Sequence, residues 1–127
     1  MTAAALVAIG VGAMLGAWLR WLLGLLLNPI FPAVPLGTLA ANLAGGYVIG
    51  IMVELLGQHS ALSPEVRLFA VTGFLGSLTT FSTFSAESVG LLSRGEYGWA
   101  TAHILVHLAG SLLLTVLGIH TVRLLQG

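Results

Sequence analysis

Residues 73–85 read Gly-Phe-Leu-Gly-Ser-Leu-Thr-Thr-Phe-Ser-Thr-Phe-Ser, and this stretch decides how the chain folds. It lies in an apolar segment long enough to cross a bilayer, yet it contains six hydroxyl side chains and two glycines. Irregular backbone at membrane depth persists only where protein or a water-filled path satisfies it, and polar groups there usually mark the route of a substrate or an ion. The stretch therefore predicts a transport protein with one helix broken in mid-membrane.

The composition is that of an integral membrane protein. Of the 127 residues, 57% are hydrophobic and 6% are charged, whereas a soluble domain carries roughly 25% charged residues. A crossing needs about 20 apolar residues, and the alternating pattern of membrane β-strands is absent. The first segment is too long for the apolar region of a signal peptide. We expect an all-α membrane protein, one transmembrane domain over residues 1–127 with helices at about 3–27, 34–57, 66–93 and 98–125.

The residues that are missing disfavour several classes of function. The sequence has no Cys, which removes disulfides, thiolate metal sites and thiol redox chemistry. It has no Asp, no Lys and no nucleophile-elbow motif, so we do not expect an enzyme. A net charge of zero without a basic run argues against nucleic acid as a partner.

The four arginines give no preferred orientation in the membrane. With four crossings, Arg67 and Arg123 lie on one side and Arg94 and, if it is not buried, Arg20 lie on the other, so the positive-inside rule does not decide. One interpretation is that a single loop arginine dominates and fixes one orientation. We favour insertion in both orientations, which permits a closed, antiparallel homodimer.

Small residues recur four positions apart in two segments, as Gly12-x-x-x-Gly16 and as Asn42-x-x-x-Gly46-x-x-x-Gly50. Such spacing favours close approach of helix backbones. Asn42 itself has two open interpretations: a hydrogen bond across a helix interface, or an amide that offers two donors to an anion.

Three further groups are candidates for an ion path. Arg20 is either a snorkelling anchor at the membrane interface or an electrostatic attractor or clamp at a vestibule. Phe81 and Phe84 share a helix face, and the positive edges of their rings can meet an anion without offering a full charge. Glycines 73 and 76, together with the threonine pair, can open the helix and expose carbonyl oxygens, which coordinate hard cations.

A polar stripe is predicted on the last helix, where His103, His107 and Ser111 follow one another at intervals of four. Histidines at this spacing can ligate zinc. No carboxylate or third histidine lies nearby in the sequence, so we favour a lined path over a metal site. Glu87, four residues after Thr83, either continues the polar line or lies near the membrane interface.

Three stretches of the sequence resemble motifs of a known family. The chain resembles the Fluc (CrcB) family of small bacterial fluoride channels over nearly its whole length. The likeness rests on the text from Gly12 to Arg20-Trp21, on Pro-Leu-Gly-Thr-Leu-x-x-Asn-x-x-Gly at 35–45, and on Gly-Phe-x-Gly-x-Leu-Thr-Thr-Phe-Ser-Thr-Phe-Ser at 73–85. The Thr-Thr-Phe-Ser-Thr-Phe string is highly specific, whereas the glycine patterns are not.

The resemblance implies a passive fluoride-selective channel in the bacterial cell (inner) membrane that exports cytoplasmic fluoride. It implies an antiparallel dual-topology homodimer with two pores and a central structural sodium ion held by backbone carbonyls of both subunits. The implied roles are an aromatic box (Phe81, Phe84), a pore donor (Asn42), a vestibule residue (Arg20), sodium-binding carbonyls (Gly76, Thr79) and a polar track (Ser82, Thr83, Thr38, Ser111).

The sequence departs from the family at two positions. Many relatives have a second glycine where this chain has Ser77, and His103 stands where a tyrosine of the polar track is expected. The alternative function is a proton-coupled cation antiporter of the small multidrug type, which also uses four helices and dual topology. That chemistry needs a carboxylate at mid-depth, and Glu54 lies near a helix end.

Overall fold

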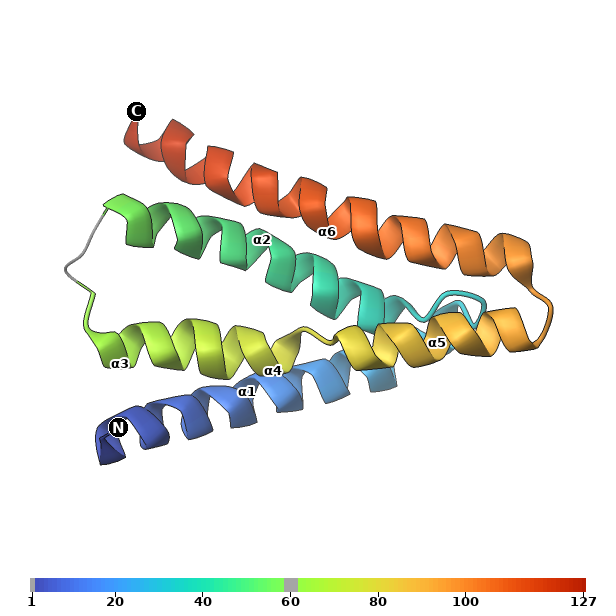
Figure 1. The fold of residues 1–127 in the computed structure, drawn as a ribbon, viewed down its shortest axis with the longest axis horizontal. Helices are drawn as coiled ribbons and strands as arrows, with labels where there is room; N and C mark the ends of the chain where they lie inside the picture. The colour runs from blue at the N-terminus through green and yellow to red at the C-terminus, as the bar shows by residue number, and fades with distance from the viewer. Residues whose placement is uncertain (1, 59–61) are drawn as a thin grey trace.

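The computed structural model describes residues 2–58 and 62–127, and the chain folds into long helices that run side by side (Figure 1). Four helical stretches are long and apolar enough to cross a membrane: Ala3–Ile30, Leu36–Gln58, Pro64–Ser93 and Tyr97–Gln126. Their elements are α1 (Ala3–Leu27), the 3₁₀ turn η1 (Asn28–Ile30), α2 (Leu36–Gln58), α3 (Pro64–Arg67), the π-helical η2 (Leu68–Leu75), α4 (Gly76–Leu78), α5 (Phe81–Ser93) and α6 (Tyr97–Gln126).

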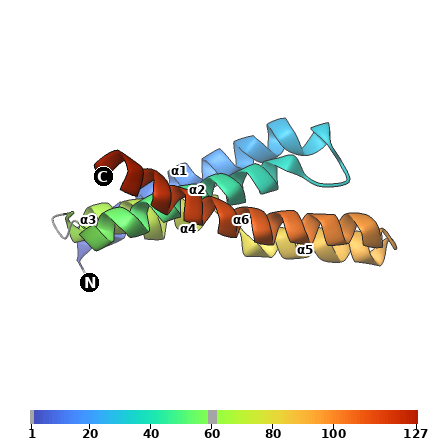
Figure 2. The same cartoon turned by 90° about the horizontal axis from the view of Figure 1, so that it is seen from above.

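The helices form two closely packed pairs. One is α2 with α6, and the other is α1 with the first half of the third stretch, η2 and α4. In Figure 2 the loop between α1 and α2 lies apart from the loop between α5 and α6, so α1 and α2 diverge from α5 and α6 at this end of the molecule. The interruption of the third stretch lies near the middle of the molecule (Figure 1).

Glycines make both pairs possible, as the small-residue spacing predicts. A Cβ atom at Gly12 would lie 2.3 Å from the carbonyl oxygen of Phe69, and one at Gly50 would lie 2.1 Å from that of Thr115. Neither separation is sterically possible, so only glycine permits these backbone contacts. Gly73, which we expected to help open the third helix, packs in the same way against Ile9 of α1.

Side-chain caps fix where the helices begin. Ser63 accepts a hydrogen bond from the backbone N–H of Val66 at 3.3 Å, as its position before Pro64 predicts. Asn28 accepts hydrogen bonds from the backbone N–H groups of Gly37 (2.7 Å) and Thr38 (3.2 Å), which closes the loop after α1 onto the start of α2. This contact positions Thr38, which is 4% exposed, toward α5.

The third stretch is interrupted at Thr79 and Thr80. Both residues are extended, with φ and ψ of −83° and 152° at Thr79 and of −149° and 117° at Thr80. The helix ends at Leu78 and begins again at Phe81. The interruption therefore falls on the threonine pair, while Gly73 and Gly76 remain in helical conformation.

Candidate functional site at the helix interruption

Side chains replace the helical hydrogen bonds that the interruption removes. Asn42 of α2 accepts from the backbone N–H of Thr80 at 2.8 Å and donates its amide to the carbonyl oxygen of Thr80 at 3.1 Å. Thr80 in turn caps α5, because its hydroxyl accepts from the N–H of Thr83 at 3.1 Å. Asn42 thus replaces the missing acceptor of the Thr80 N–H and adds a donor to the Thr80 carbonyl, which also accepts the first bond of α5 because Thr80 is the N-cap of that helix. Side-chain contacts of this kind let non-helical backbone survive in a membrane.

The first half of the broken helix has its own stabilising contact. Arg20 of α1 donates through Nε to the carbonyl oxygen of Ser77 at 2.9 Å. A cation at a helix C-terminus offsets the negative end of the helix dipole. Arg20 therefore lies where one of the two sequence interpretations, the clamp, requires.

The interruption also leaves two carbonyl oxygens without their helical N–H donors. In a continuous helix the N–H of Thr80 would donate to Gly76 and that of Thr83 to Thr79. Here these N–H groups bond to Asn42 and to the hydroxyl of Thr80 instead. The carbonyl oxygens of Gly76 and Thr79 are left without these helical donors, and carbonyl oxygens are the ligands that hard cations prefer.

An open cavity of about 460 Å³ lies beside the interruption. It brings together six of the site residues predicted from the sequence: Asn42, Gly76, Thr79, Phe81, Phe84 and Ser111. The other predicted residues are not among its lining: Arg20, Thr38, Ser82, Thr83 and His103. The cavity is therefore built from α2, the broken stretch and α6 together.

The two phenylalanines differ in their surroundings. The Phe81 side chain is exposed (78%), whereas Phe84 is half-buried, and their ring centroids lie 5.6 Å apart at an interplanar angle of 59°. Phe84 also packs against both histidines of α6, with centroid distances of 5.4 Å to His103 and 4.7 Å to His107. Phe84 thus joins the cavity to a second polar group deeper in the fold.

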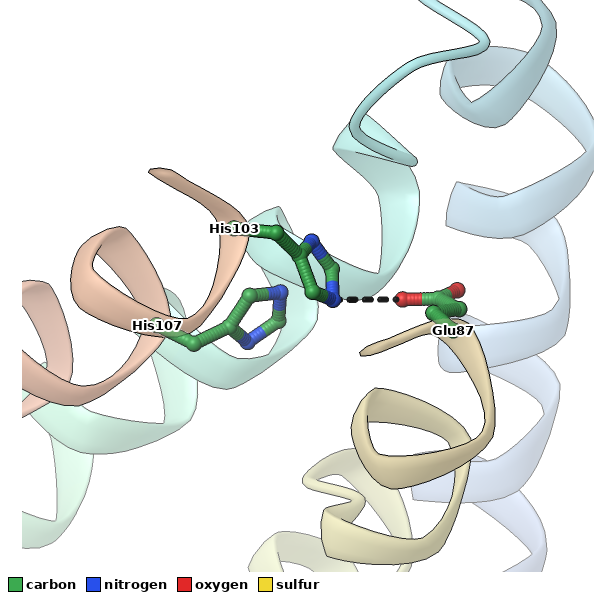
Figure 3. Close-up of side chains that lie close together, drawn as sticks. All are labelled: Glu87, His103 and His107. Carbon is green, nitrogen blue, oxygen red and sulfur yellow. Dashed lines mark ion pairs between the residues drawn. The ribbon is translucent and has the colours of Figure 1, made fainter. Parts of the chain in front are cut away.

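That second group consists of Thr38, Glu87, His103 and His107, which we call the Glu–His cluster. Thr38 donates its hydroxyl to Glu87 Oε2 at 2.7 Å, and Glu87 Oε1 lies 3.4 Å from His103 Nε2 (Figure 3). In Figure 3, Glu87 points from α5 toward the two histidines of α6. The sequence placed Thr38 and His103 on the path but left Glu87 undecided, although its spacing of three from Phe84 puts both on one helix face.

Comparison with known proteins identifies the family. Residues 7–119 match the model of the CrcB-like protein family, described as Camphor Resistance (CrcB). The chain belongs to this family.

Relatives of this chain carry a functional name. The chain is 65% identical to the "Fluoride-specific ion channel FluC" of Nitrosospira multiformis, over 94% of this chain and 93% of the relative. It is 62% identical to the protein of the same name from Cupriavidus taiwanensis, over 94% of each chain. The match therefore covers all four membrane-spanning stretches.

Within this CrcB-like chain, Asn42 satisfies the helix-interface interpretation. One amide hydrogen goes to Thr80, and the other goes to Nδ1 of His107 at 3.1 Å. Service as an anion donor would require one of these bonds to open. The bond to His107 is the more exchangeable of the two, because the bond to Thr80 holds the interrupted backbone.

Proposed function

We propose that this chain forms a passive, fluoride-selective channel that exports cytoplasmic fluoride across a bacterial cell membrane. The observation that carries the proposal is the near full-length identity of 65% to a protein named as a fluoride-specific ion channel. Its four membrane-spanning stretches make the chain a multi-pass membrane protein. Neutral HF enters cells and ionises in a less acidic cytoplasm, and a selective anion pore lets the membrane potential expel the ion without ATP.

The chemistry of the cavity supports an anion path. None of the described lining residues is Lys, Arg, Asp or Glu, so a passing ion meets no full countercharge. Conduction needs sites that favour entry yet still release the ion. The positive ring edges of Phe81 and Phe84 supply attraction of this moderate kind, and the amide of Asn42 and the hydroxyl of Ser111 lie along the same lining. Thr38, Ser82, Thr83 and His103 extend the polar track beyond it.

A second copy of the chain is part of the proposal. One subunit leaves Phe81 exposed and the cavity open, and four helices alone enclose little. The arginines divide two and two between the sides of the membrane when Arg20 is counted with Arg94. We propose an antiparallel homodimer in which the partner closes two such cavities into two pores, with the interruption at mid-membrane and Arg20 near the vestibule.

A structural sodium ion fits the released carbonyl oxygens. Gly76 and Thr79 line the cavity and offer carbonyl oxygens that lack their helical donors, and hard monovalent cations are coordinated by such carbonyl groups. When bound between two subunits, the ion would supply countercharge to the converging carbonyl dipoles. Its role is structural.

Ion efflux from liposomes tests the function. Purified protein is reconstituted, and fluoride and chloride electrodes record release together. We expect rapid fluoride release with negligible chloride release, and a large loss of fluoride flux in Phe81→Leu and Phe84→Leu. Phe31→Leu is the matched control, because Phe31 lies outside the cavity, beside Trp99.

Three results would overturn the proposal. One is the absence of fluoride flux from folded, dimeric protein. Another is proton-coupled uptake of organic cations, which would favour the antiporter and make Glu87 its carboxylate. Equal flux of fluoride and chloride would remove selectivity and, with it, export as the physiological role.

A further inference from the structure

We propose that Glu87, His103 and His107 form a binding site for a divalent transition metal of the Zn²⁺ type. Each residue offers one ligand atom, and the three atoms lie within 4.8 Å of one another. Figure 3 shows the three side chains converging from α5 and α6. The site could not be predicted from the sequence, because its third ligand, Glu87, lies on a different helix from the histidine pair.

The donor set matches zinc chemistry. Two imidazole nitrogens and one carboxylate oxygen form a common three-residue zinc set, which leaves a fourth position for water. Bond lengths of about 2.0–2.1 Å place tetrahedral ligand atoms about 3.3 Å apart. Glu87 Oε1 and His103 Nε2 are 3.4 Å apart, so this pair already has the required separation. The other two pairs lie within 4.8 Å and must draw closer on binding.

The ligand atoms are otherwise unpartnered. Among the described residues, Glu87 Oε1, both nitrogens of His103 and Nε2 of His107 are buried without a hydrogen bond. His103 is 0% exposed and His107 is 4% exposed. Buried polar atoms are normally satisfied by protein, water or an ion, and a metal satisfies one atom of each residue in a single step.

The remaining contacts supply the supporting shell that metal sites require. Thr38 holds the second carboxylate oxygen of Glu87 at 2.7 Å. Phe84 packs against both imidazole rings and excludes water from one side. His107 also lines the open cavity, which gives a metal ion a route to the cluster.

Asn42 couples this site to the cavity. Its oxygen accepts from Thr80, so its nitrogen must be the group that donates to Nδ1 of His107. Neutral His107 then carries its proton on Nε2. Metal binding through Nε2 moves that proton to Nδ1 and breaks the hydrogen bond from Asn42. Since Asn42 is the proposed pore donor, an occupied metal site disturbs the pore, and this inhibition, unlike the binding itself, rests on the proposed function.

Metal binding to the purified full-length protein is the decisive experiment. Titration calorimetry with Zn²⁺ on chelator-treated protein should give one site per chain. Glu87→Gln, His103→Gln and His107→Gln should each weaken binding by about 10- to 100-fold or more, since even supporting residues cost that much. His120→Gln is the matched control, because His120 is exposed on the same helix.

A substitute ligand gives a positive readout. The chain has no cysteine, so His107→Cys introduces a single thiolate. Its Co²⁺ complex should acquire a sulfur-to-metal absorption band that wild-type protein lacks. Three results would each overturn the site. The first is that wild type does not bind zinc, and the second is that the three Gln variants bind zinc as tightly as wild type. The third is that folded His107→Cys shows no such absorption band with Co²⁺.

Fluoride efflux separates the site from its consequence. Micromolar Zn²⁺ should slow fluoride efflux in wild type and in His120→Gln. In Glu87→Gln, the Zn²⁺ concentration that inhibits efflux should rise by at least tenfold, when inhibition is measured relative to the zinc-free flux of that variant. Zinc binding without any fluoride flux would support the site and refute only the channel. Zinc binding with unaltered flux would overturn the coupling through Asn42.

Discussion

The interruption and the Glu–His cluster are both polar regions inside membrane-spanning helices, yet they differ in how their hydrogen bonds are satisfied. At the interruption, Asn42 and Thr80 exchange two hydrogen bonds and Arg20 holds the end of α4. In the cluster, both nitrogens of His103 are buried without a hydrogen bond, and Nε2 only faces Glu87 Oε1 at 3.4 Å. A satisfied region stabilises one backbone arrangement, whereas an unsatisfied one costs free energy that a ligand can recover.

The comparison predicts opposite outcomes for substitutions in the two regions. Removing a polar group from the interruption orphans a buried backbone group, which costs about 1–3 kcal/mol. Removing the His103 ring from the cluster eliminates nitrogens that already lack a hydrogen bond.

Asn42→Ala should have the largest effect. The N–H of Thr80 loses its acceptor and its carbonyl loses one of its donors, so we expect a loss of about 2–3 kcal/mol, measured by denaturant unfolding in detergent. Asn42→Asp is the matched variant, because it keeps an acceptor for Thr80 N–H but has no donor for its carbonyl. An Asp variant less stable than the Ala variant would contradict the acceptor role.

Thr38→Val should have an intermediate effect. It removes the hydroxyl that donates to Glu87 Oε2 at 2.7 Å and leaves the carboxylate with no protein donor at that oxygen. We expect a loss of about 1–2 kcal/mol. Thr101→Val on α6 is the control, since its hydroxyl bonds only within its own exposed turn. Equal losses in the two variants would show that the contact with Glu87 stabilises nothing.

His103→Leu should leave the unfolding free energy unchanged or raise it, in contrast to the two losses above. The substitution exchanges a buried ring with two unsatisfied nitrogens for an apolar side chain of similar size. We expect unfolding free energy to stay within about 0.5 kcal/mol of wild type or to rise. A decrease as large as that of Asn42→Ala would mean that the ring nitrogens are satisfied in the native protein, and the contrast between the two regions would fail.

The sequence predicted the features that depend on short-range pattern. Apolar length gave the four membrane-spanning stretches, Ser63 before Pro64 gave a helix start, and the small-residue spacing gave the glycine contacts. Each of these depends on residues within one segment. The likeness in residues 73–85 likewise identified the family, because a string of that specificity is read directly from neighbouring positions.

The features that the sequence left open depend on contacts between segments. Spacing alone could not choose between the two interpretations of Asn42, because its partners Thr80 and His107 lie on other helices. Arg20 meets Ser77 across 57 residues. The Glu–His cluster was missed because the distance from Glu87 to His103 is set by how α5 packs on α6, which periodicity within either helix does not report.

Arg94→Gln should have the smallest effect on folding and a distinct effect on insertion. Arg94 is exposed and pairs with Glu96 at 2.8 Å in the loop after α5, and exposed pairs contribute little to stability. Removing this charge changes the arginine balance from two against two to two against one, so insertion should shift toward one orientation.

Since the chain has no cysteine, a single cysteine at Gly127 can be labelled from either side of the membrane. Equal labelling is expected before the substitution and unequal labelling after it. Strongly one-sided labelling of the parent would refute dual topology while leaving the contrast between the interruption and the cluster intact, because every contact in that contrast lies within one subunit.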